Sequence, residues 1–294
     1  MITVFGSINL DQVYQVTRLP KAGETLSGNA YMQVPGGKGA NQALAARRSG
    51  AEVTMLGCVG RDANADLALS LLTKDGVDLT YLQISEGPTG CASVWVGADG
   101  ENSIVVFAGA NAELNATKVP KEVIEKSDFL LLQMEVPSAE NSQILKIAKK
   151  CGVTTLLNLA PVAPVSEDML HDLNYLVLNE IEASFLAKQL GQQAIDMDQL
   201  LAYFSDTYDL CCVITLGGDG VKAQNAGERF YVPADTVEVV DTTAAGDSFI
   251  GGFCAALERG EALQDALKSA TAIAGLSCTR AGAQTSIPYL RESY

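Results

Sequence analysis

DTTAAGDSFIGGF, Asp241 to Phe253, gathers small residues around a single carboxylate, Asp247. The preceding residues VEVVDT have a strand-like composition and SFIGGFCAALERG has a helical pattern, so this stretch predicts a strand-to-helix corner. The first N–H groups of a helix lack partners within the helix and carry partial positive charge, and small side chains let an anion approach them. Asp247 then has two interpretations: an N-cap or dipole partner of its own helix, or a base beside an anion-binding site.

Outward from this corner, short apolar strands alternate with longer helical patterns. The strand patterns cover residues 2–6, 52–60, 129–134, 153–159, 175–179 and 211–217. The helical patterns cover residues 40–50, 62–76, 138–152, 180–191 and 247–260. This rhythm predicts βαβ units with right-handed crossovers. We therefore expect an α/β fold with a mostly parallel sheet that is covered by helices on both faces.

Two stretches interrupt the rhythm because they offer no helical pattern, residues 10–35 and 89–108. The second contains two β-rich arms around Asp99-Gly100, which indicates a hairpin. We expect a small antiparallel sheet that stands off the main body as a lid or a dimer contact. The alternative is an edge extension of the main sheet. Since no repeat or linker is evident, residues 1–294 are predicted to form a single domain with this lid.

Composition limits the classes of function. The chain has 294 residues, of which 48% are hydrophobic, and a net charge of −15, which disfavours a nucleic-acid or anionic membrane surface. The start of the chain does not read as a targeting peptide, and no apolar stretch is long enough to span a membrane, so we expect a cytoplasmic protein. The seven cysteines form no C-x-x-C pair, which predicts buried, reduced thiols. The only histidine, His171, argues against a Ser/His/Asp triad or a histidine-rich metal site.

The common nucleotide-binding loops are absent. No G-x-x-x-x-G-K-[ST] sequence occurs, and no G-x-G-x-x-G follows the first strand. The second absence argues against a dinucleotide-dependent oxidoreductase.

A second polar stretch, PGGKGANQA at 35–43, precedes the first predicted helix. Its glycines allow a close approach of the backbone to a ligand, and Asn41 can both donate to and accept from hydroxyl groups. Asn9 and Asp11 stand at the end of the first strand. Parallel sheets bind ligands at the carboxyl ends of their strands, so these residues predict a polyol site. A base and an anion hole beside such a site suit phosphoryl transfer to an alcohol.

Taken together, five motifs resemble those of the ribokinase family of carbohydrate kinases. They are GSINLD (6–11), PGGKGANQA (35–43), LNEIEA (178–183), TLGGDG (215–220) and DTTAAGDSF (241–249). Their order and spacing match the family through the closing TRAGAQTSIP (279–288), and they are most similar to its ribokinase branch. The resemblance implies a three-layer α/β/α sandwich with a β lid. It also implies ATP-dependent phosphorylation of the primary hydroxyl of D-ribose to give D-ribose 5-phosphate.

The resemblance further implies a role for each matching residue. Asp247 matches the catalytic base that activates the sugar hydroxyl. The anion hole is matched by Ala244, Ala245 and Gly246. The sugar contacts are matched by Asn9, Asp11, Gly37, Lys38, Asn41 and Glu135, together with Asp247.

ATP, Mg²⁺ and a monovalent cation, usually potassium, are implied in the same way. Asn179 and Glu182 match an N-x-x-E motif that organises Mg²⁺ and phosphate through water molecules. The nucleotide contacts are matched by Thr215, Gly217, Gly218, Gly220, Gly246 and Thr271. The monovalent-cation positions, some of them backbone carbonyls, are matched by Asp241, Thr243, Ser277, Arg280, Gly282 and Ser286.

Other acceptors stay open at this point. The same chemistry could act on deoxyribose, a ketohexose or a nucleoside, and Tyr14, Tyr31 and Trp95 offer an aromatic platform for a nucleoside. A non-catalytic sugar-binding regulator is a further alternative, although Asp247 and the N-x-x-E motif favour catalysis. In the family, exposed edges of the lid are often covered by a partner's lid, so the resemblance implies a homodimer.

Overall fold

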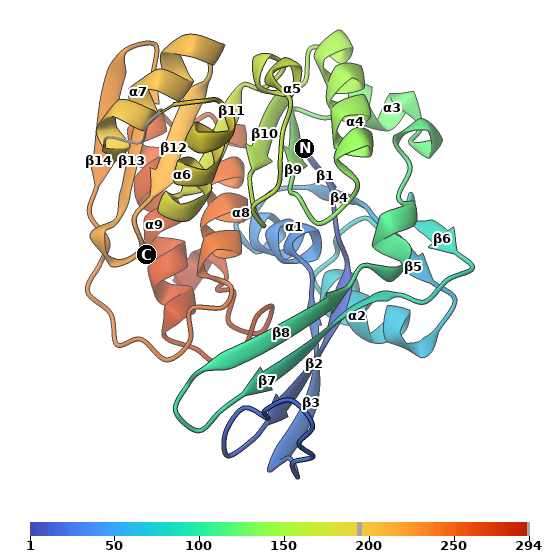
Figure 1. Ribbon diagram of the computed structural model, residues 1–294. Helices are drawn as coiled ribbons and strands as arrows, with labels where there is room; N and C mark the ends of the chain where they lie inside the picture. Colours follow the sequence, from blue (N-terminus) through green and yellow to red (C-terminus); the bar gives the residue numbers. More distant parts are fainter. Residues whose placement is uncertain (193–195, 293–294) are drawn as a thin grey trace.

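The computed structural model describes residues 1–192 and 196–292. Among these residues, eight strands form the main sheet (Figure 1). Their order is β14 (Glu228–Val232), β13 (Val221–Asn225), β12 (Cys211–Thr215), β11 (Tyr175–Asn179), β10 (Thr154–Asn158), β9 (Phe129–Leu132), β1 (Ile2–Phe5) and β4 (Val53–Leu56). Neighbouring strands from β12 to β4 run parallel, and the β12–β13 and β13–β14 pairs run antiparallel.

Helices cover both faces of this sheet. One face carries α1 (Lys38–Arg48), α2 (Ala63–Lys74), α8 (Ala245–Glu258) and α9 (Leu263–Cys278). The other carries α3 (Lys121–Glu125), α4 (Ser138–Cys151), α5 (Glu167–His171), α6 (Glu180–Gln189) and α7 (Met197–Tyr208). The predicted α/β/α sandwich with a mostly parallel sheet is confirmed.

Alternation along the strands separates two hydrophobic cores. In β12, Cys211 and Val213 enter the core beneath α8 and α9, whereas Cys212 and Ile214 enter the core beneath α6 and α7. Successive side chains of a strand point to opposite faces, so a strand buried on both sides must be apolar at every position. This explains the uninterrupted apolar run CCVI in the sequence.

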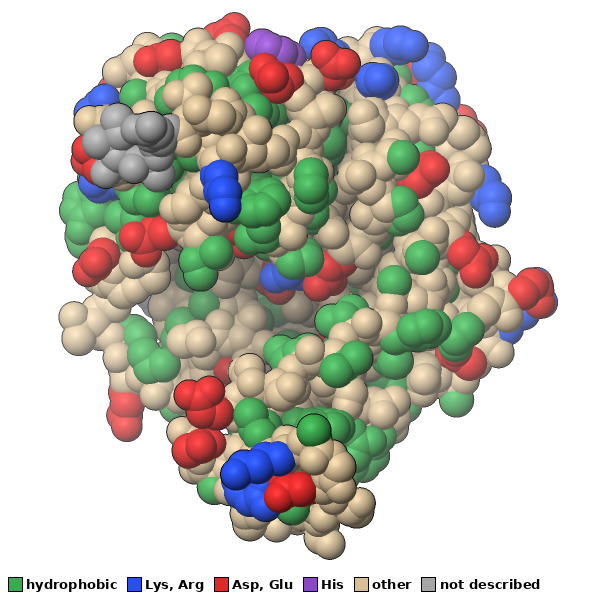
Figure 2. Space-filling model, viewed as in Figure 1, with side chains coloured by type: hydrophobic (Ala, Val, Ile, Leu, Met, Phe, Trp, Pro, Cys, Tyr) green, Lys and Arg blue, Asp and Glu red, His purple; other side chains and the backbone are tan. Residues whose placement is uncertain are grey.

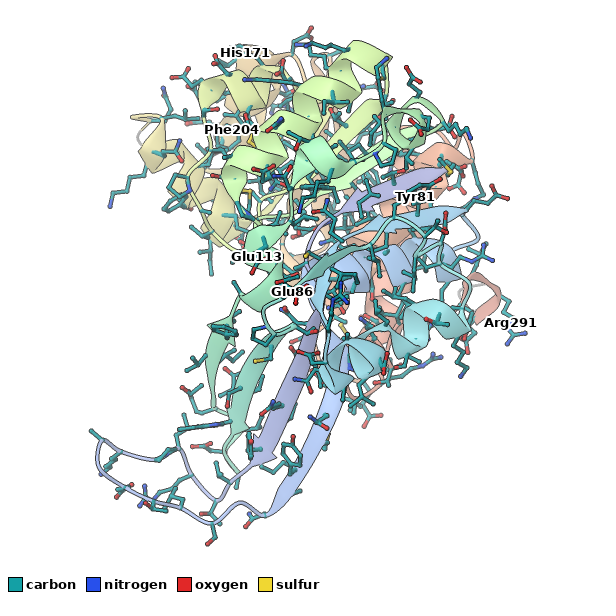
Figure 3. The ribbon with its side chains drawn as sticks, turned by 90° about the vertical axis from the view of Figure 1, so that its right-hand side faces the viewer. Tyr81, Glu86, Glu113, His171, Phe204 and Arg291 are labelled. Carbon is teal, nitrogen blue, oxygen red and sulfur yellow. The ribbon has the colours of Figure 1, made fainter. Side chains whose placement is uncertain are left out.

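A separate sheet, here called the small sheet, projects from one end of the main body (Figures 1 and 3). It contains β3 (Ala30–Gly36), β2 (Asn9–Gln15), β7 (Gly90–Val96) and β8 (Asn102–Phe107), in that order. Because it shares no strand with the main sheet, the alternative of an edge extension is wrong. The predicted hairpin around Asp99-Gly100 is the antiparallel β7–β8 pair.

Two predicted strands differ from the structure. Residues 52–60 break at Gly57, after which β5 (Cys58–Gly60) leaves the main sheet and pairs with β6 (Gln83–Ser85). VEVVDT, 237–242, is not a strand, so the corner before Asp247 joins an irregular segment to a helix. Val239 and Val240 are 61% and 60% exposed, and the N–H of Val240 donates to the carbonyl of Cys278 instead of to a strand.

The connections bring the predicted site residues to one edge of the main sheet. β1 leads into β2, and β3 returns to α1 through Gly37, whose φ of +88° suits glycine. In the main sheet, β1 pairs with β4 on one side and with β9 on the other. Ligands of such sheets bind where the strand order reverses, outside the carboxyl ends. Within the described ranges, no helix has the length and apolar character needed to cross a membrane.

Candidate active site

Asp247 lies in the first turn of α8 with only 5% of its surface exposed. Its carboxylate accepts hydrogen bonds from consecutive residues of α1. Nδ2 of Asn41 donates to Oδ2 at 2.8 Å, and Nε2 of Gln42 donates to Oδ1 at 2.9 Å. The N-cap of α8 is Ala244, and no side chain caps the helix. The N-cap interpretation of Asp247 is therefore wrong, and its carboxylate is held by another helix.

Backbone donors adjoin this carboxylate at the start of α8. The N–H of Ala245 donates to the carbonyl of Thr242 at 3.1 Å, so this group is engaged within the protein. For the N–H groups of Gly246 and Asp247, no acceptor exists in the described part of the chain. A Cβ at Gly246 would meet nothing within 4 Å. The donors available to an anion thus include those of Gly246 and Asp247 but not that of Ala245.

Asn9 and Asp11 are the first and third residues of β2, at the end of the small sheet that adjoins the main body. Asn9 is buried, and its Oδ1 accepts from Nδ2 of Asn111 at 2.7 Å. Asp11 is half-buried, and desolvation raises its pKa to about 7, with smaller contributions from the charges of Glu135 and Asp247. The residues predicted to contact the sugar therefore share one acidic neighbourhood.

Glu135, which follows β9, holds the loop that begins α1. Its Oε2 accepts from Oγ of Ser7 at 2.6 Å and from the backbone N of Lys38 at 3.0 Å. The charge of Asp247 is the main cause that raises the pKa of Lys38; desolvation lowers it, and Glu135 and Glu182 raise it further. The Lys38 ammonium therefore stays charged and offsets part of the surrounding negative charge.

The glycines of the loop before α1 permit close packing within the protein. A Cβ at Gly37 would lie 2.7 Å from the N of Asn9, and one at Gly39 would lie 2.5 Å from the N of Ser7. Both distances are too short for any real Cβ contact. These glycines therefore let the loop pack closely against residues 6–9, which connect β1 to β2, and their approach to a ligand stays a prediction.

A cavity of about 460 Å³ lies beside the start of α8. It is lined by every residue that the sequence predicted for the nucleotide, namely Thr215, Gly217, Gly218, Gly220, Gly246 and Thr271. Most of the other lining residues are small or apolar, including Val221, Phe249 and Ala274. Its volume is in the range of small-molecule sites.

Figure 2 shows a hollow between the main body and the small sheet, with basic and acidic side chains on its wall.

The glycines around this cavity have two different tasks. A Cβ at Gly217 or Gly218 would meet nothing within 4 Å, so these positions leave room for a ligand. A Cβ at Gly220 would lie 2.1 Å from the carbonyl oxygen of Val232, so this glycine lets two chain segments cross.

Asn179 and Glu182 form the capping box of α6. The backbone N of Asn179 donates to Oε2 of Glu182 at 2.8 Å, and Oδ1 of Asn179 accepts from the N of Glu182 at 2.9 Å. Each carboxylate oxygen of Glu182 accepts one hydrogen bond, which leaves further lone pairs. Desolvation is the main cause that raises the pKa of Glu182. This pair fits a role in holding Mg²⁺ through water molecules.

No group of three or more His, Cys, Asp or Glu side chains suited to a metal ion occurs in residues 1–192 and 196–292. Mg²⁺ often binds through one or two carboxylates together with substrate phosphates. The donor set near Glu182 is consistent with this mode.

The segments predicted to hold a monovalent cation meet around Asp241. Its Oδ1 accepts from the N of Thr243 at 2.9 Å, and its Oδ2 accepts from the N of Gly282 at 2.9 Å. Desolvation raises the pKa of Asp241, but the hydrogen bond from the Thr243 hydroxyl and these two backbone bonds bring the pKa below its ordinary value, so the group is ionised. The side chain of Arg280 pairs with Glu292 and Oγ of Ser286 donates to the carbonyl of Ala283. The Asp241 carboxylate supplies oxygen donors of the kind that a hard cation prefers, and the predicted carbonyl ligands stay a prediction.

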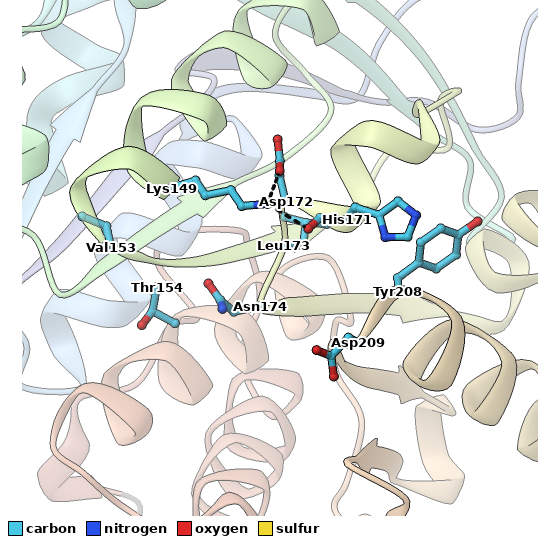
Figure 4. Close-up of a pocket in the computed structure, with 10 residues that line it drawn as sticks. Lys149, Val153, Thr154, His171, Asp172, Leu173, Asn174, Tyr208 and Asp209 are labelled. Atoms are coloured by element: carbon cyan, nitrogen blue, oxygen red, sulfur yellow. Dashed lines mark hydrogen bonds and ion pairs between the residues drawn. The ribbon is translucent and has the colours of Figure 1, made fainter.

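A second cavity, of about 500 Å³, lies at the opposite edge of the main sheet (Figure 4). Lys149 and Asp172 form an ion pair of 2.5 Å there, and the rings of His171 and Tyr208 are 4.9 Å apart. None of the predicted site residues lines this cavity. It adjoins the amino ends of β10 and β11, away from the edge where Asp247 lies.

Three residues that contact the predicted site residues were not predicted from the sequence: Gln42, Ser7 and Asn111. Gln42 and Ser7 lie inside the motifs PGGKGANQA and GSINLD, and this position is the signal that could have found them. Asn111 lies 102 positions from the Asn9 that it contacts, so no local pattern could connect the two.

Comparisons with known proteins agree with this geometry. The model of the pfkB family of carbohydrate kinases matches residues 1–290. The chain is 38% identical over 298 residues to ribokinase from Haemophilus influenzae, with 99% of this chain and 96% of that protein covered. It also matches the crystal structure of ribokinase from Thermotoga maritima, at 35% identity and a TM-score of 0.94, with 99% of this chain and 97% of the other covered.

The structure of Arabidopsis thaliana ribokinase complexed with ribose and ATP is similar as well. Its TM-score is 0.90 at 31% identity, and the match covers 99% of this chain and 96% of that one. The full-length family match and these relatives lead to one conclusion. The chain belongs to the pfkB family of carbohydrate kinases.

Proposed function

We propose that this protein catalyses the ATP-dependent phosphorylation of the primary hydroxyl of D-ribose, which gives D-ribose 5-phosphate and ADP. The observation that carries the proposal is the position of Asp247. Its carboxylate is bonded to Asn41 on the sugar side, and the adjacent Gly246 lines the cavity of about 460 Å³. A carboxylate between an alcohol site and a nucleotide site suits phosphoryl transfer. The names of the relatives support the same donor and acceptor.

In this mechanism Asp247 takes the proton of the primary hydroxyl as that oxygen attacks the γ-phosphate. Both carboxylate oxygens are already oriented by amide donors, so little reorganisation is needed when the hydroxyl arrives. The N–H groups of Gly246 and Asp247, with Ala244 and Ala245 shaping the turn, stabilise negative charge on the transferred phosphoryl group.

Sugar recognition is assigned to Asn9, Asp11, Gly37, Lys38, Asn41 and Glu135. Oδ1 of Asn41 is buried without a partner, so it is ready to accept from a sugar hydroxyl. The NH₂ group of Asn9 can donate a hydrogen bond to a sugar hydroxyl, and the carboxylate of Asp11 can accept one. This set suits a small polyhydroxylated ring.

The aromatic residues of the small sheet argue against a nucleoside acceptor. Tyr14 pairs in register with Tyr31 and Trp95, and the two tyrosine rings are 4.9 Å apart. Tyr14 lies five residues along β2 from Asn9. At about 3.3 Å per residue, this separation is roughly 16 Å. The aromatic cluster is thus at the far end of the sheet and gives no platform beside the sugar contacts.

Nucleotide and ions complete the proposal. We assign ATP contacts to Thr215, Gly217, Gly218, Gly220, Gly246 and Thr271. Asn179 and Glu182 would hold Mg²⁺ through water, and Asp241, Thr243, Ser277, Arg280, Gly282 and Ser286 would hold K⁺, partly through carbonyls. When bound, these cations would offset the negative charge of the phosphates.

We also propose that residues 1–294 act as one kinase domain, with residues 10–35 and 89–108 as its lid. The edge strand β8 exposes four large apolar side chains in succession, Ile104, Val105, Val106 and Phe107, each more than half exposed. An exposed apolar edge strand is normally covered, and a second copy of the chain is the occupant that we propose, as a homodimer through the lid. The seven unbonded cysteines support a reducing, cytoplasmic location.

The test is ADP release with Mg-ATP and potassium in the presence of D-ribose, 2-deoxyribose, fructose or adenosine. We expect ribose-dependent ADP release by the wild-type chain. Asp247→Asn should fold normally and lose about 10²–10⁴-fold in kcat, because it removes the base. An Asp247→Asn rate within a few fold of wild type would remove Asp247 from the mechanism. ADP release with another acceptor but not ribose would reassign the substrate.

A further inference from the structure

Gln42 is a completely buried amide, with 0% of its surface exposed, and it contacts the carboxylate of Asp247. Its Nε2 donates to Oδ1 of Asp247 at 2.9 Å and to Oδ1 of Asn158 at 3.0 Å. An amide NH₂ group has two protons, so both are used. Oε1 of Gln42 is buried without a hydrogen-bond partner.

The orientation of this amide follows from its neighbours. Asn158, at the end of β10, donates its own Nδ2 to the carbonyl of Val177 at 3.3 Å, which leaves its Oδ1 facing Gln42. The other neighbour is a carboxylate. If the Gln42 amide were rotated by 180°, Oε1 would face two acceptors and no donor. The NH₂ group is therefore the end that faces Asp247.

Close packing of two helices sets the distance. A Cβ at Gly251, one turn after Asp247 in α8, would lie 2.5 Å from the Cβ of Ala45 and 2.6 Å from the carbonyl oxygen of Gln42. Because glycine lets α8 approach α1 this closely, the side chain of Gln42 can reach the carboxylate. The chain of contacts Val177–Asn158–Gln42–Asp247 thus ties the first turn of α8 to the main sheet.

We propose that Gln42 is a positioning residue for the phosphoryl transfer. Its amide holds Oδ1 of Asp247 on the buried side, so that Oδ2, bonded by Asn41, is the oxygen presented to the sugar hydroxyl. The inference rests on the proposed function, in which Asp247 takes the hydroxyl proton. Gln42 does not touch the sugar or the nucleotide in this arrangement. Its effect is on the geometry of the reacting carboxylate and therefore on kcat.

The experiment compares Gln42→Leu, which keeps the volume but removes the donors, with Gln224→Leu. Gln224 is also buried and also donates its Nε2 to a carboxylate, Asp206, at 2.9 Å. It pairs with Cys212, in the half of β12 away from Thr215, so it lies far from the cavity. Q224L is thus a control for the loss of an amide–carboxylate hydrogen bond made by a buried glutamine.

We expect Gln42→Leu to lower kcat by about 10–100-fold, the cost typical of a misplaced reacting group, while KM for ribose and for ATP changes less than about threefold. Gln224→Leu should leave kcat unchanged. Equal kcat values for the two variants would overturn the inference.

A double-mutant comparison separates positioning from a general structural effect. In an Asp247→Asn background, Gln42→Leu should change the residual kcat by less than about twofold, because Gln42 acts only through the carboxylate. An equal loss in both backgrounds would assign Gln42 a structural role and overturn the inference. If Asp247→Asn itself kept near wild-type activity, the proposed function would fail first. If Gln42→Leu did not fold, Gln42→Met, which also lacks the NH₂ donors and adds no charge beside Asp247, gives the same comparison.

Discussion

Nδ2 of Asn111 donates to Oδ1 of Asn9 at 2.7 Å, and it joins two residues that lie 102 positions apart. The rest of the Asn111 amide binds the backbone of Ile8, since its Oδ1 accepts from the Ile8 N at 2.9 Å and its Nδ2 donates to the Ile8 carbonyl at 3.1 Å. With Oδ1 of Asn9 occupied, the NH₂ group of Asn9 is the end left for a ligand. Asn111, in η1 (Gly109–Glu113) just after β8, thus links the small sheet to a sugar contact.

Replacement of Asn111 by leucine should therefore weaken ribose binding. The loss of a buried hydrogen-bond partner typically costs about 1–3 kcal/mol, so KM for ribose should rise by about tenfold or more, with a smaller change in kcat. Steady-state kinetics with ribose as the varied substrate measures the effect. Asn141→Leu is the control, because Asn141 is also fully buried but bonds the carbonyl of Gln133. An equal rise of KM in both variants would contradict the assignment.

Asp11 should make ribose capture depend on pH near neutrality. Since desolvation raises its pKa to about 7, the carboxyl of the free enzyme is protonated below that pH and loses its capacity to accept two hydroxyl hydrogen bonds. We expect kcat/KM for ribose to fall as the pH drops below 7. Asp11→Asn should show a low kcat/KM with no such step. A wild-type profile that is flat between pH 6 and 8 would argue against this role.

The same shift predicts an effect on stability. The folded protein binds a proton at Asp11 up to about pH 7, whereas the unfolded chain releases it near the ordinary pKa of 3.8. The stability linked to this group is present below pH 4 and is lost as the pH rises through 7. Asp11→Asn should therefore raise the free energy of unfolding at pH 8 by up to about 4 kcal/mol, and the melting temperature should rise with it. Near pH 4 the substitution should leave both quantities unchanged. Melting curves at the two pH values test this.

The buried ion pair of Arg48 with Asp75 should be essential for stability. Nε of Arg48 lies 2.6 Å from Oδ2 of Asp75, and its Nη1 donates to the carbonyls of Gln284 and Ile287. Arg48→Met would leave the Asp75 carboxylate unpaired, at a cost of about 3–5 kcal/mol. Urea unfolding measures the loss. The exposed Arg18–Glu24 pair provides the control, because Arg18→Met should leave the midpoint nearly unchanged.

A charge on β8 should separate the proposed dimer. Val105 is 67% exposed on an edge strand, so Val105→Glu would place a charge in an interface that buries this strand. We expect the wild-type chain to sediment as a dimer and the variant as a monomer. Leu67→Glu, at another exposed apolar residue in α2, should leave the dimer intact. A monomeric wild-type chain at micromolar concentration would contradict the proposal.

Most of the main sheet could be predicted from the sequence because its strands are buried on both faces and read as unbroken apolar runs. The pattern failed at VEVVDT, where three valines favour a strand but no neighbouring strand pairs with them. Valine has a local preference for β structure, but this preference forms a strand only where a second strand is there to pair with it. Val239 and Val240 therefore stay exposed near the nucleotide cavity. At Gly57 the apolar run continues, but the strand leaves one sheet for another.

Local sequence patterns were enough to predict the alternation of strands and helices, the two helix-free segments and the small-residue turn before Asp247, since each of these depends on residues close together in the chain. The partner of each polar group depends instead on how distant segments pack. Asp247 could have capped its own helix, and it is bound by Asn41 and Gln42 because Gly251 lets α8 pack tightly against α1. The close packing of Gly37 and Gly39 against residues 6–9 is likewise a contact that only the folded chain shows. A hydrogen bond between residues hundreds of positions apart leaves no local pattern, so it emerges only when the chain has folded.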